Sequence, residues 1–387
     1  MIYLDNQATT PLDPRALEAM MPLWGTHYAN SGSVTHQAGR DVARMVDSAI
    51  AEIARSIGAA EDELVITSGA TESNNLALLG VMHHPRQRRR KVVSLVTEHK
   101  AVLGPLGRLR QQGFDVQLLP VQNQDSELPG VVDLERLSQM VDDQTALVSI
   151  MLANNEIGSL QPVAQIAAIC RQAGCYLHTD ASQALGRLPV DVDELDVDLL
   201  SFSAHKFYGP KGVGGLYVRR RDRTVRLQGQ IVGGGQQHNL RSGTLNTAGI
   251  IGMQVALSNS LANLVQDQIQ IGDLREQLYQ RLKEIPELML NGPPLRPEVR
   301  LGGNLNCCFY PLEGQSLMLL MPDLAVSSGS ACTSADPEPS HVLQAIGLTE
   351  DQARSSLRFG IGRLNTSQEI DQAADWLIAA ANKLRSF

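Results

Sequence analysis

Two residues in the middle of the chain have the types and the setting needed for chemistry at a carbonyl carbon. Lys206 follows the acidic and apolar run 196–200, which indicates the approach to a buried strand, and a glycine- and proline-rich turn follows at 209–215. A lysine amine that is desolvated or set near other cations has a lowered pKa and can form a Schiff base. The alternative for this segment alone is a surface lysine in a turn.

Asp180 ends a second apolar segment, 175–179, about 25 residues before the lysine. Pyridoxal phosphate enzymes need an aspartate against the ring nitrogen and a lysine at the other end of the ring. The two side chains occur on successive predicted strands, which favours this cofactor. The alternative is that Asp180 caps a helix, the commoner role of an isolated aspartate at this place.

The amino-acid sequence around the lysine indicates a protein family. The segment 203–212, Ser-Ala-His-Lys-Phe-Tyr-Gly-Pro-Lys-Gly, is similar to the lysine motif of cysteine desulfurases of the NifS and IscS type, which are class-V aminotransferase-like enzymes of fold type I. The resemblance implies an α/β fold with a large pyridoxal phosphate domain at 13–252, built on a mostly parallel seven-stranded sheet. It also implies a smaller α+β domain from 1–12 and 253–387, which carries the catalytic cysteine loop at about 325–337.

The elements that must position these residues alternate along the chain. Apolar runs at 64–67, 92–96, 116–119 and 147–151 predict strands, and amphipathic segments between them predict helices. Such alternation predicts a mostly parallel sheet whose ligands gather at the carboxyl ends of the strands. Five polar residues follow predicted strand ends and are expected to converge: Thr71, His99, Asn155, Asp180 and Lys206.

The remainder of the cofactor site comes from this convergence and from the resemblance. The turn 68–75 joins a strand to a helix and offers backbone N–H groups to an anion. The alternative is a plain capping box, which has the same pattern of residues. His99 is either a satisfied structural residue or, by the resemblance, the ring stacked on the cofactor and a proton carrier. The resemblance assigns the phosphate to Ala70, Thr71, Ser203 and His205, and the phenolic oxygen to Asn155 and Gln183.

A glycine run at 233–235 leads to Gly243 and Thr244. The resemblance implies that Thr244 reaches across a homodimer interface to the phosphate held by the partner. The alternative is a glycine-rich phosphate turn within one chain.

Two further motifs concern the substrate. Cys332 lies among glycine and small hydroxyl residues that cannot pack a core, so we expect an exposed, mobile thiol, as in the longer cysteine loop of the housekeeping and nitrogenase-type desulfurases. Arg358 matches the arginine that holds the α-carboxylate of the substrate through two parallel hydrogen bonds, and a structural arginine is the alternative. Asn30 and Asn155 match residues on the substrate side, although Gln7 and the loop 29–34 depart from the usual wording.

These residues predict a cysteine desulfurase. L-Cysteine is held by Arg358 and Asn155, Lys206 moves the α-proton, and the Cys332 thiolate attacks the substrate sulfur, which gives L-alanine and a persulfide for an iron-sulfur scaffold or another acceptor. No permanent metal site is expected, apart from transient binding of an iron-sulfur cluster at Cys332. The alternatives are a selenocysteine lyase or cysteine lyase of the same fold, and a catalytically idle protein that docks scaffold partners.

The amino-acid composition excludes several functional classes of protein. The 387 residues carry a formal charge of −8, which argues against a nucleic-acid or membrane-surface binder. The basic runs 86–91 and 219–223 are expected to be solvated loop charge. No apolar run reaches the roughly 20 residues of a membrane span, and the amino terminus lacks a signal peptide pattern, which predicts a cytoplasmic protein. The other four cysteines, Cys170, Cys175, Cys307 and Cys308, are expected to be buried.

Overall fold

The computed structural model describes residues 1–328 and 339–386. Seven strands in these residues form one sheet in the order β2-β8-β7-β6-β5-β3-β4, in which β8 runs antiparallel to both neighbours and the other four pairs are parallel. The predicted mostly parallel α/β sheet is confirmed. The strands are β2 Leu64–Thr67, β3 Lys91–Leu95, β4 Asp115–Leu119, β5 Thr145–Ser149, β6 Tyr176–Asp180, β7 Leu199–Ser203 and β8 Gly214–Val218.

Helices cover both faces of this sheet, which explains why six of its strands, all but β4, are buried almost from end to end. Val92 faces the helices α3 and α4, whereas the next residue, Val93, faces the core that includes α6. The helices of this part are α1 Pro14–Gly25, α2 Gln37–Arg55, α3 Ala70–Met82, α4 Lys100–Gln111, α5 Leu134–Met140 and α6 Val163–Ala173, with short 3-10 helices at Glu61–Glu63, Ala204–Lys206 and Gln237–Asn239.

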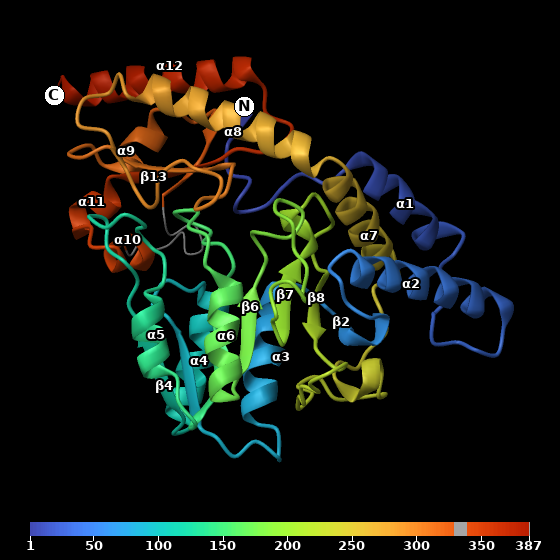
Figure 1. The fold of residues 1–387 in the computed structure, drawn as a ribbon. Helices are drawn as coiled ribbons and strands as arrows, with labels where there is room; N and C mark the ends of the chain where they lie inside the picture. The colour runs from blue at the N-terminus through green and yellow to red at the C-terminus, as the bar shows by residue number, and fades with distance from the viewer. Residues whose placement is uncertain (329–338, 387) are drawn as a thin grey trace.

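A second set of elements lies above the carboxyl edge of the sheet and has its own hydrophobic core (Figure 1). Its four-stranded sheet has the order β12-β13-β10-β9, and a separate two-stranded sheet pairs β1 with β11. The predicted boundaries at 12/13 and 252/253 stay a prediction. The elements are β1 Ile2–Tyr3, β9 Met289–Leu290, β10 Asn304–Cys308, α9 Gly314–Leu319, β11 Leu324–Ala325, β12 Ser327–Ser328, α10 His341–Ala345, α11 Glu350–Arg354, β13 Ser356–Gly360 and α12 Ser367–Arg385.

The sequence from about 252 to 285 predicts one long amphipathic helix, and this prediction is wrong. The segment forms two helices, α7 Thr247–Ala262 and α8 Leu264–Leu282, which bend by 73° at Asn263. The Asn263 side chain donates to the Asn259 carbonyl at 2.8 Å, so it satisfies a carbonyl at the end of α7. This bend lets α7 pack on α1 and α2 while α8 packs on α12 (Figure 1).

Within the described part of the chain, no single helix is long and apolar enough to cross a membrane. The bent pair α7 and α8 reaches that length and apolar character only when its two helices are counted as one segment.

Candidate active site

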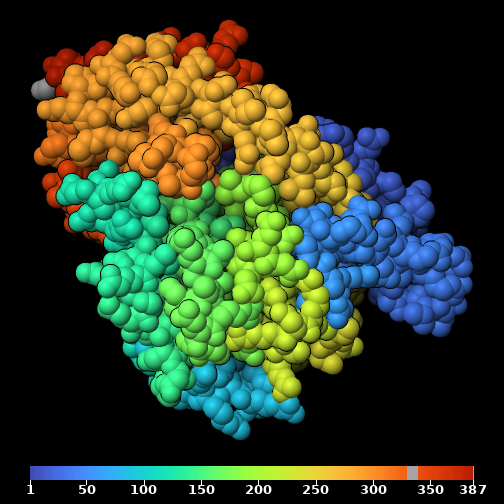
Figure 2. All heavy atoms as spheres, in the orientation of Figure 1, coloured from blue at the N-terminus to red at the C-terminus, as the bar shows by residue number. Residues whose placement is uncertain are grey.

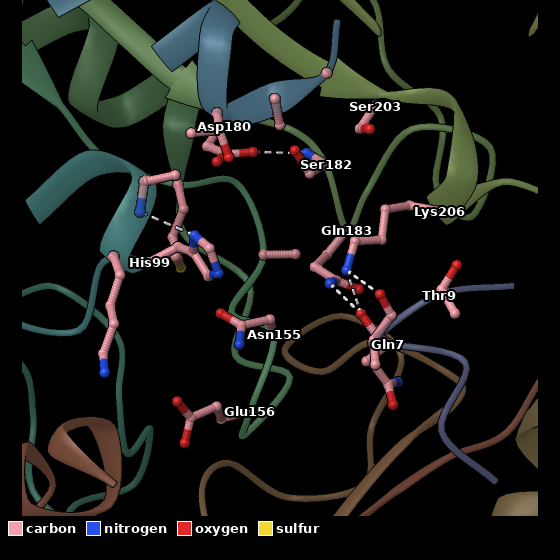
Figure 3. A pocket seen from close by; sticks show the side chains of 18 of the residues that line it. Gln7, Thr9, His99, Asn155, Glu156, Asp180, Ser182, Gln183, Ser203 and Lys206 are labelled. Atoms are coloured by element: carbon pink, nitrogen blue, oxygen red, sulfur yellow. Dashed lines mark hydrogen bonds between the residues drawn. The ribbon is translucent and has the colours of Figure 1, made fainter. Parts of the chain in front are cut away.

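A cavity of about 870 Å³ lies where the parallel strands end, and the second set of elements contributes to its walls. Side chains from loops after several strands point into it (Figure 3). Ten of the residues singled out from the sequence line this cavity: Ala70, Thr71, His99, Asn155, Asp180, Gln183, Ser203, His205, Lys206 and Arg358.

Asp180 is fixed at one side of the cavity. Its Oδ2 accepts a hydrogen bond of 2.7 Å from Asn74 Nδ2, and its Oδ1 accepts one of 2.9 Å from the Ser182 backbone N–H. Only 7% of Asp180 and none of Asn74 is exposed. The aspartate therefore has one fixed orientation, because hydrogen bonds to a buried carboxylate are strong and costly to lose.

Lys206 reaches the same cavity from the 3-10 helix that follows β7 (Figure 3). Its Nζ donates to the carbonyl oxygens of Gln7 at 2.5 Å and Ala8 at 2.9 Å, both in the amino-terminal arm. Burial, followed by the nearby cations Arg187 and Arg358, lowers the pKa of Lys206 to about 8. Such an amine gives up its proton more readily than an ordinary lysine, which makes the neutral form that attacks a carbonyl more accessible near neutral pH.

His99 is positioned by its own helix. It is the N-cap of α4, and its Nδ1 accepts a hydrogen bond of 3.0 Å from the Ala101 backbone N–H. Nδ1 must therefore be the unprotonated nitrogen, and Nε2 carries the proton in the neutral ring. Burial lowers the pKa of His99, with Asp180 opposing and Lys206 adding to the effect.

The turn before α3 has the features of an anion site. Gly69 has φ 144°, a conformation that side chains rarely adopt, and a Cβ there would meet Ser203 Oγ at 3.3 Å. The first N–H groups of α3, including those of Ala70 and Thr71, have no carbonyl partner within the helix and border the cavity. Glu72, the acid in this turn, is paired with Arg241 at 2.9 Å, which offsets its charge beside the site.

Arg358 lies on β13 and is 3% exposed. Its Nη2 donates to Asp5 Oδ1 at 2.8 Å and to Ser327 Oγ at 3.1 Å, and its Nη1 donates to the Asn155 carbonyl at 3.0 Å. The Nε atom is buried and has no hydrogen-bond partner. The guanidinium is thus firmly oriented and keeps donor capacity for an anionic group in the cavity.

Two of the predicted site residues that the structure describes do not line the cavity of the single chain. Asn30 and Thr244 are exposed, and the Asn30 side chain accepts from the Gly32 backbone N–H at 2.8 Å within its own loop. Cys332 lies outside the described residues. The described residues on either side of that segment border the site, because Ser327 contacts Arg358 and Pro339 lines the cavity.

Other residues at the site were missed from the sequence. Their signal in the sequence is weak: Asn74 lies one turn after Thr71 on the same helix, and Asp5 lies in the short amino-terminal segment before the first helix. Those that contact or line the site are Asp5, Asn74, Glu156, Ser182, Arg187 and His341.

The geometry fits pyridoxal 5'-phosphate. An anion-binding helix start, a fixed carboxylate and a reactive lysine amine face one cavity, and the buried Ser182 Oγ beside them has no partner. Arg358 keeps donor capacity, including its unpartnered Nε, for a carboxylate on the substrate. The fold and this site define a pyridoxal phosphate-dependent enzyme of fold type I.

Comparisons with known proteins identify the branch. The family model for class-V aminotransferases matches residues 2–373. Cysteine desulfurase IscS of Rickettsia akari is 46% identical over 99% of this chain and 92% of the relative, and a cysteine desulfurase of Mus musculus is 45% identical over 99% and 82%. A solved NifS-like protein has a TM-score of 0.90 and 35% identity with both chains fully covered, and SspA in complex with cysteine has 0.80 and 31% over 95% and 100%.

The chain belongs to the class-V aminotransferase family, among its cysteine desulfurases. Members of this family depend on pyridoxal 5'-phosphate, so the predicted family and cofactor are confirmed.

Proposed function

We propose that this protein removes sulfur from L-cysteine and gives L-alanine and a persulfide on Cys332. The observation that supports this most is the meeting of Asp180, Lys206 and Arg358 in one cavity whose rim is next to the segment carrying Cys332. When bound, the cofactor supplies an electron sink for the carbon atoms of the amino acid. The residues of this chain supply binding, orientation and proton transfer.

Each residue has a distinct task in this proposal. Asp180, held by Asn74, would pair with the ring nitrogen of the cofactor, and the start of α3 would hold its phosphate. Arg358 binds the α-carboxylate of L-cysteine through its donors. Lys206 Nζ takes the α-proton, which a pKa of about 8 permits because the neutral amine is then accessible near neutral pH.

The thiol chemistry balances without a further reagent. The Cys332 thiolate attacks the substrate sulfur, a sulfur–sulfur bond forms, and the bond between sulfur and Cβ breaks. The electron pair of that bond stays with the carbon, which gains a proton and becomes the methyl group of alanine. His99, whose Nε2 carries the proton of its neutral ring, is the proposed proton carrier for the substrate sulfur.

The proposal includes a homodimer in which Thr244 completes the phosphate site of the partner subunit. Thr244 is exposed and outside the cavity of its own chain. Near the amino terminus, α1 and the loop after it form a part that projects from one side of the molecule (Figure 2). This part exposes large apolar side chains, which favours an interface: Leu17, Met21, Trp24, Tyr28 and Val34. Persulfide transfer to an iron-sulfur scaffold or another acceptor protein, and a cytoplasmic location, are parts of the same proposal.

The decisive experiment separates cofactor chemistry from sulfur capture. The Cys332→Ala variant is expected to keep the visible cofactor band and to lose sulfide release, whereas Lys206→Ala is expected to lose turnover altogether. Alanine and sulfide are measured with L-cysteine as substrate, and the persulfide is located by mass spectrometry. Cys308→Ala, a change at a buried thiol on β10, serves as the matched control. Full activity of Cys332→Ala or of Lys206→Ala would refute the assigned role.

A further inference from the structure

Arg187 lies behind the lysine, on the side of the amino-terminal arm. Its Nη1 donates to Gln183 Oε1 at 3.0 Å, and its Nη2 donates to the carbonyl oxygens of Asn6 at 2.6 Å and Lys206 at 3.0 Å. All three acceptors are uncharged. Among the ion pairs formed by residues 1–328 and 339–386, none includes Arg187, whereas the neighbouring Arg358 is paired with Asp5 at 2.8 Å. The positive charge of Arg187 is therefore not offset by a carboxylate there.

The contact with Gln183 fixes the orientation of an amide in the cavity wall. Arginine has only donors, so the atom of Gln183 that faces Arg187 must be the oxygen. The Gln183 amide nitrogen then lies on the opposite side, where it donates to the Gln7 carbonyl at 3.0 Å and keeps a second N–H (Figure 3). A residue at position 187 without donors would let this amide turn over.

The contact with Lys206 brings a charge close to the reactive amine. After burial, Arg187 is the largest of the effects that lower the pKa of Lys206, followed by Arg358, while Asp180 and Asp5 act in the opposite direction. Because Asp5 lies directly on Arg358, the charge of Arg358 is partly cancelled. Arg187 thus has the stronger net influence on Lys206 among the two cations.

We propose that Arg187 is a positioning residue for this reaction, which holds the Gln183 amide in one orientation and places an uncancelled positive charge behind the Lys206 amine. The proposal rests on the pyridoxal phosphate site described above. Its charge effect concerns the enzyme without substrate, so this part can be tested without L-cysteine and does not depend on whether L-cysteine is desulfurated.

The test is a pH titration of the visible cofactor band in the full-length holoenzyme without substrate. Removal of the charge in Arg187→Met is expected to raise the midpoint of this titration by about one pH unit, because the protonated form of the Lys206 nitrogen is then less disfavoured. Arg187→Gln, which keeps a donor for Gln183, is expected to show a similar rise, and Arg187→Lys to stay within about 0.3 units of the wild type. Arg281→Met, at an ion-paired arginine on α8, is the control.

A second measurement tests the orientation of the amide. Gln183→Ala and Arg187→Met are combined, and kcat for L-cysteine is compared with the single variants. If Arg187 acts through Gln183, its replacement costs less in the Gln183→Ala background than in the wild type.

The outcomes separate this proposal from a purely structural role, in which Arg187 only fastens the arm at Asn6. Unchanged midpoints in Arg187→Met and Arg187→Gln with a lowered melting temperature would overturn the charge effect, as would an equal shift in Arg187→Lys. If the fold loss in kcat of the double variant equals the product of the losses of the two single variants, Arg187 does not act through Gln183, and that part of the proposal is overturned. If Arg187→Met does not fold, Arg187→Gln decides the titration.

Discussion

The hydrogen bond from Asn74 to Asp180 leads to a prediction for cofactor binding whose size can be estimated from the energy of that bond. Asn74→Ala removes the shorter of the two hydrogen bonds that the carboxylate accepts, the one of 2.7 Å, and leaves the bond of 2.9 Å from Ser182. Water does not easily replace the lost donor, because Asn74 is fully buried and Asp180 is 7% exposed.

A hydrogen bond to a charged group contributes about 1.5–3 kcal/mol, and 1.4 kcal/mol is a factor of about ten in an equilibrium constant. Asp180 contributes to cofactor binding as an oriented, ionised group. We therefore expect the dissociation constant for pyridoxal 5'-phosphate to rise by about 10- to 100-fold in Asn74→Ala.

The assay is a titration of the apoprotein with pyridoxal 5'-phosphate, followed by absorbance, together with kcat at saturating cofactor. Asn382→Ala, the same change at an exposed position of the helix α12, is the matched control. A change of less than about threefold in the dissociation constant, in a variant that folds like the wild type, would show that Asn74 does not orient the aspartate.

Two other outcomes follow from the site. Arg358→Lys is expected to raise KM for L-cysteine by about 10- to 100-fold with a smaller effect on kcat, because a single ammonium cannot make two parallel bonds to a carboxylate. Initial rates of alanine formation measure both constants. An unchanged KM would contradict the assigned role of Arg358. Burial raises the pKa of Glu156 to about 7, above its value of about 4.5 in the unfolded chain. Between these two values the folded state binds more protons than the unfolded state. The stability of the folded state therefore falls as pH rises from about 4.5 to about 7. Urea unfolding between these values should show a smaller fall in Glu156→Gln, by up to about 3 kcal/mol, and an identical pH dependence in both proteins would disprove the assignment.

Much of the site could be predicted from the sequence because a parallel sheet places the ends of its strands at one edge. His99 and Asn155 follow β3 and β5, and Asp180 ends β6, so their strand-end positions sufficed to bring them together. The same logic does not apply to Asn74, Arg187 and similar supporting residues. They contact the site through pairs such as Asn74 and Asp180, which are 106 residues apart, and no local pattern reports such a contact.

The bend at Asn263 was missed for a different reason. Neither glycine nor proline marks it, and the apolar residues continue on both sides. Tertiary packing decides the direction of α8, because α8 packs on α12, which lies near the carboxyl end of the chain. Thr244 and Asn30 form a third case, because their predicted roles depend on a second subunit or on the substrate.

The amino-terminal arm has a consequence for biosynthesis. Ile2 and Tyr3 pair with Leu324 and Ala325, and both chain ends lie in the same part of the molecule (Figure 1). During synthesis, the residues of this arm therefore wait for a partner strand that is made more than 300 residues later. The carbonyl groups that hold the Lys206 amine belong to this arm, so capture of the vitamin-derived coenzyme should be a late event that follows translation.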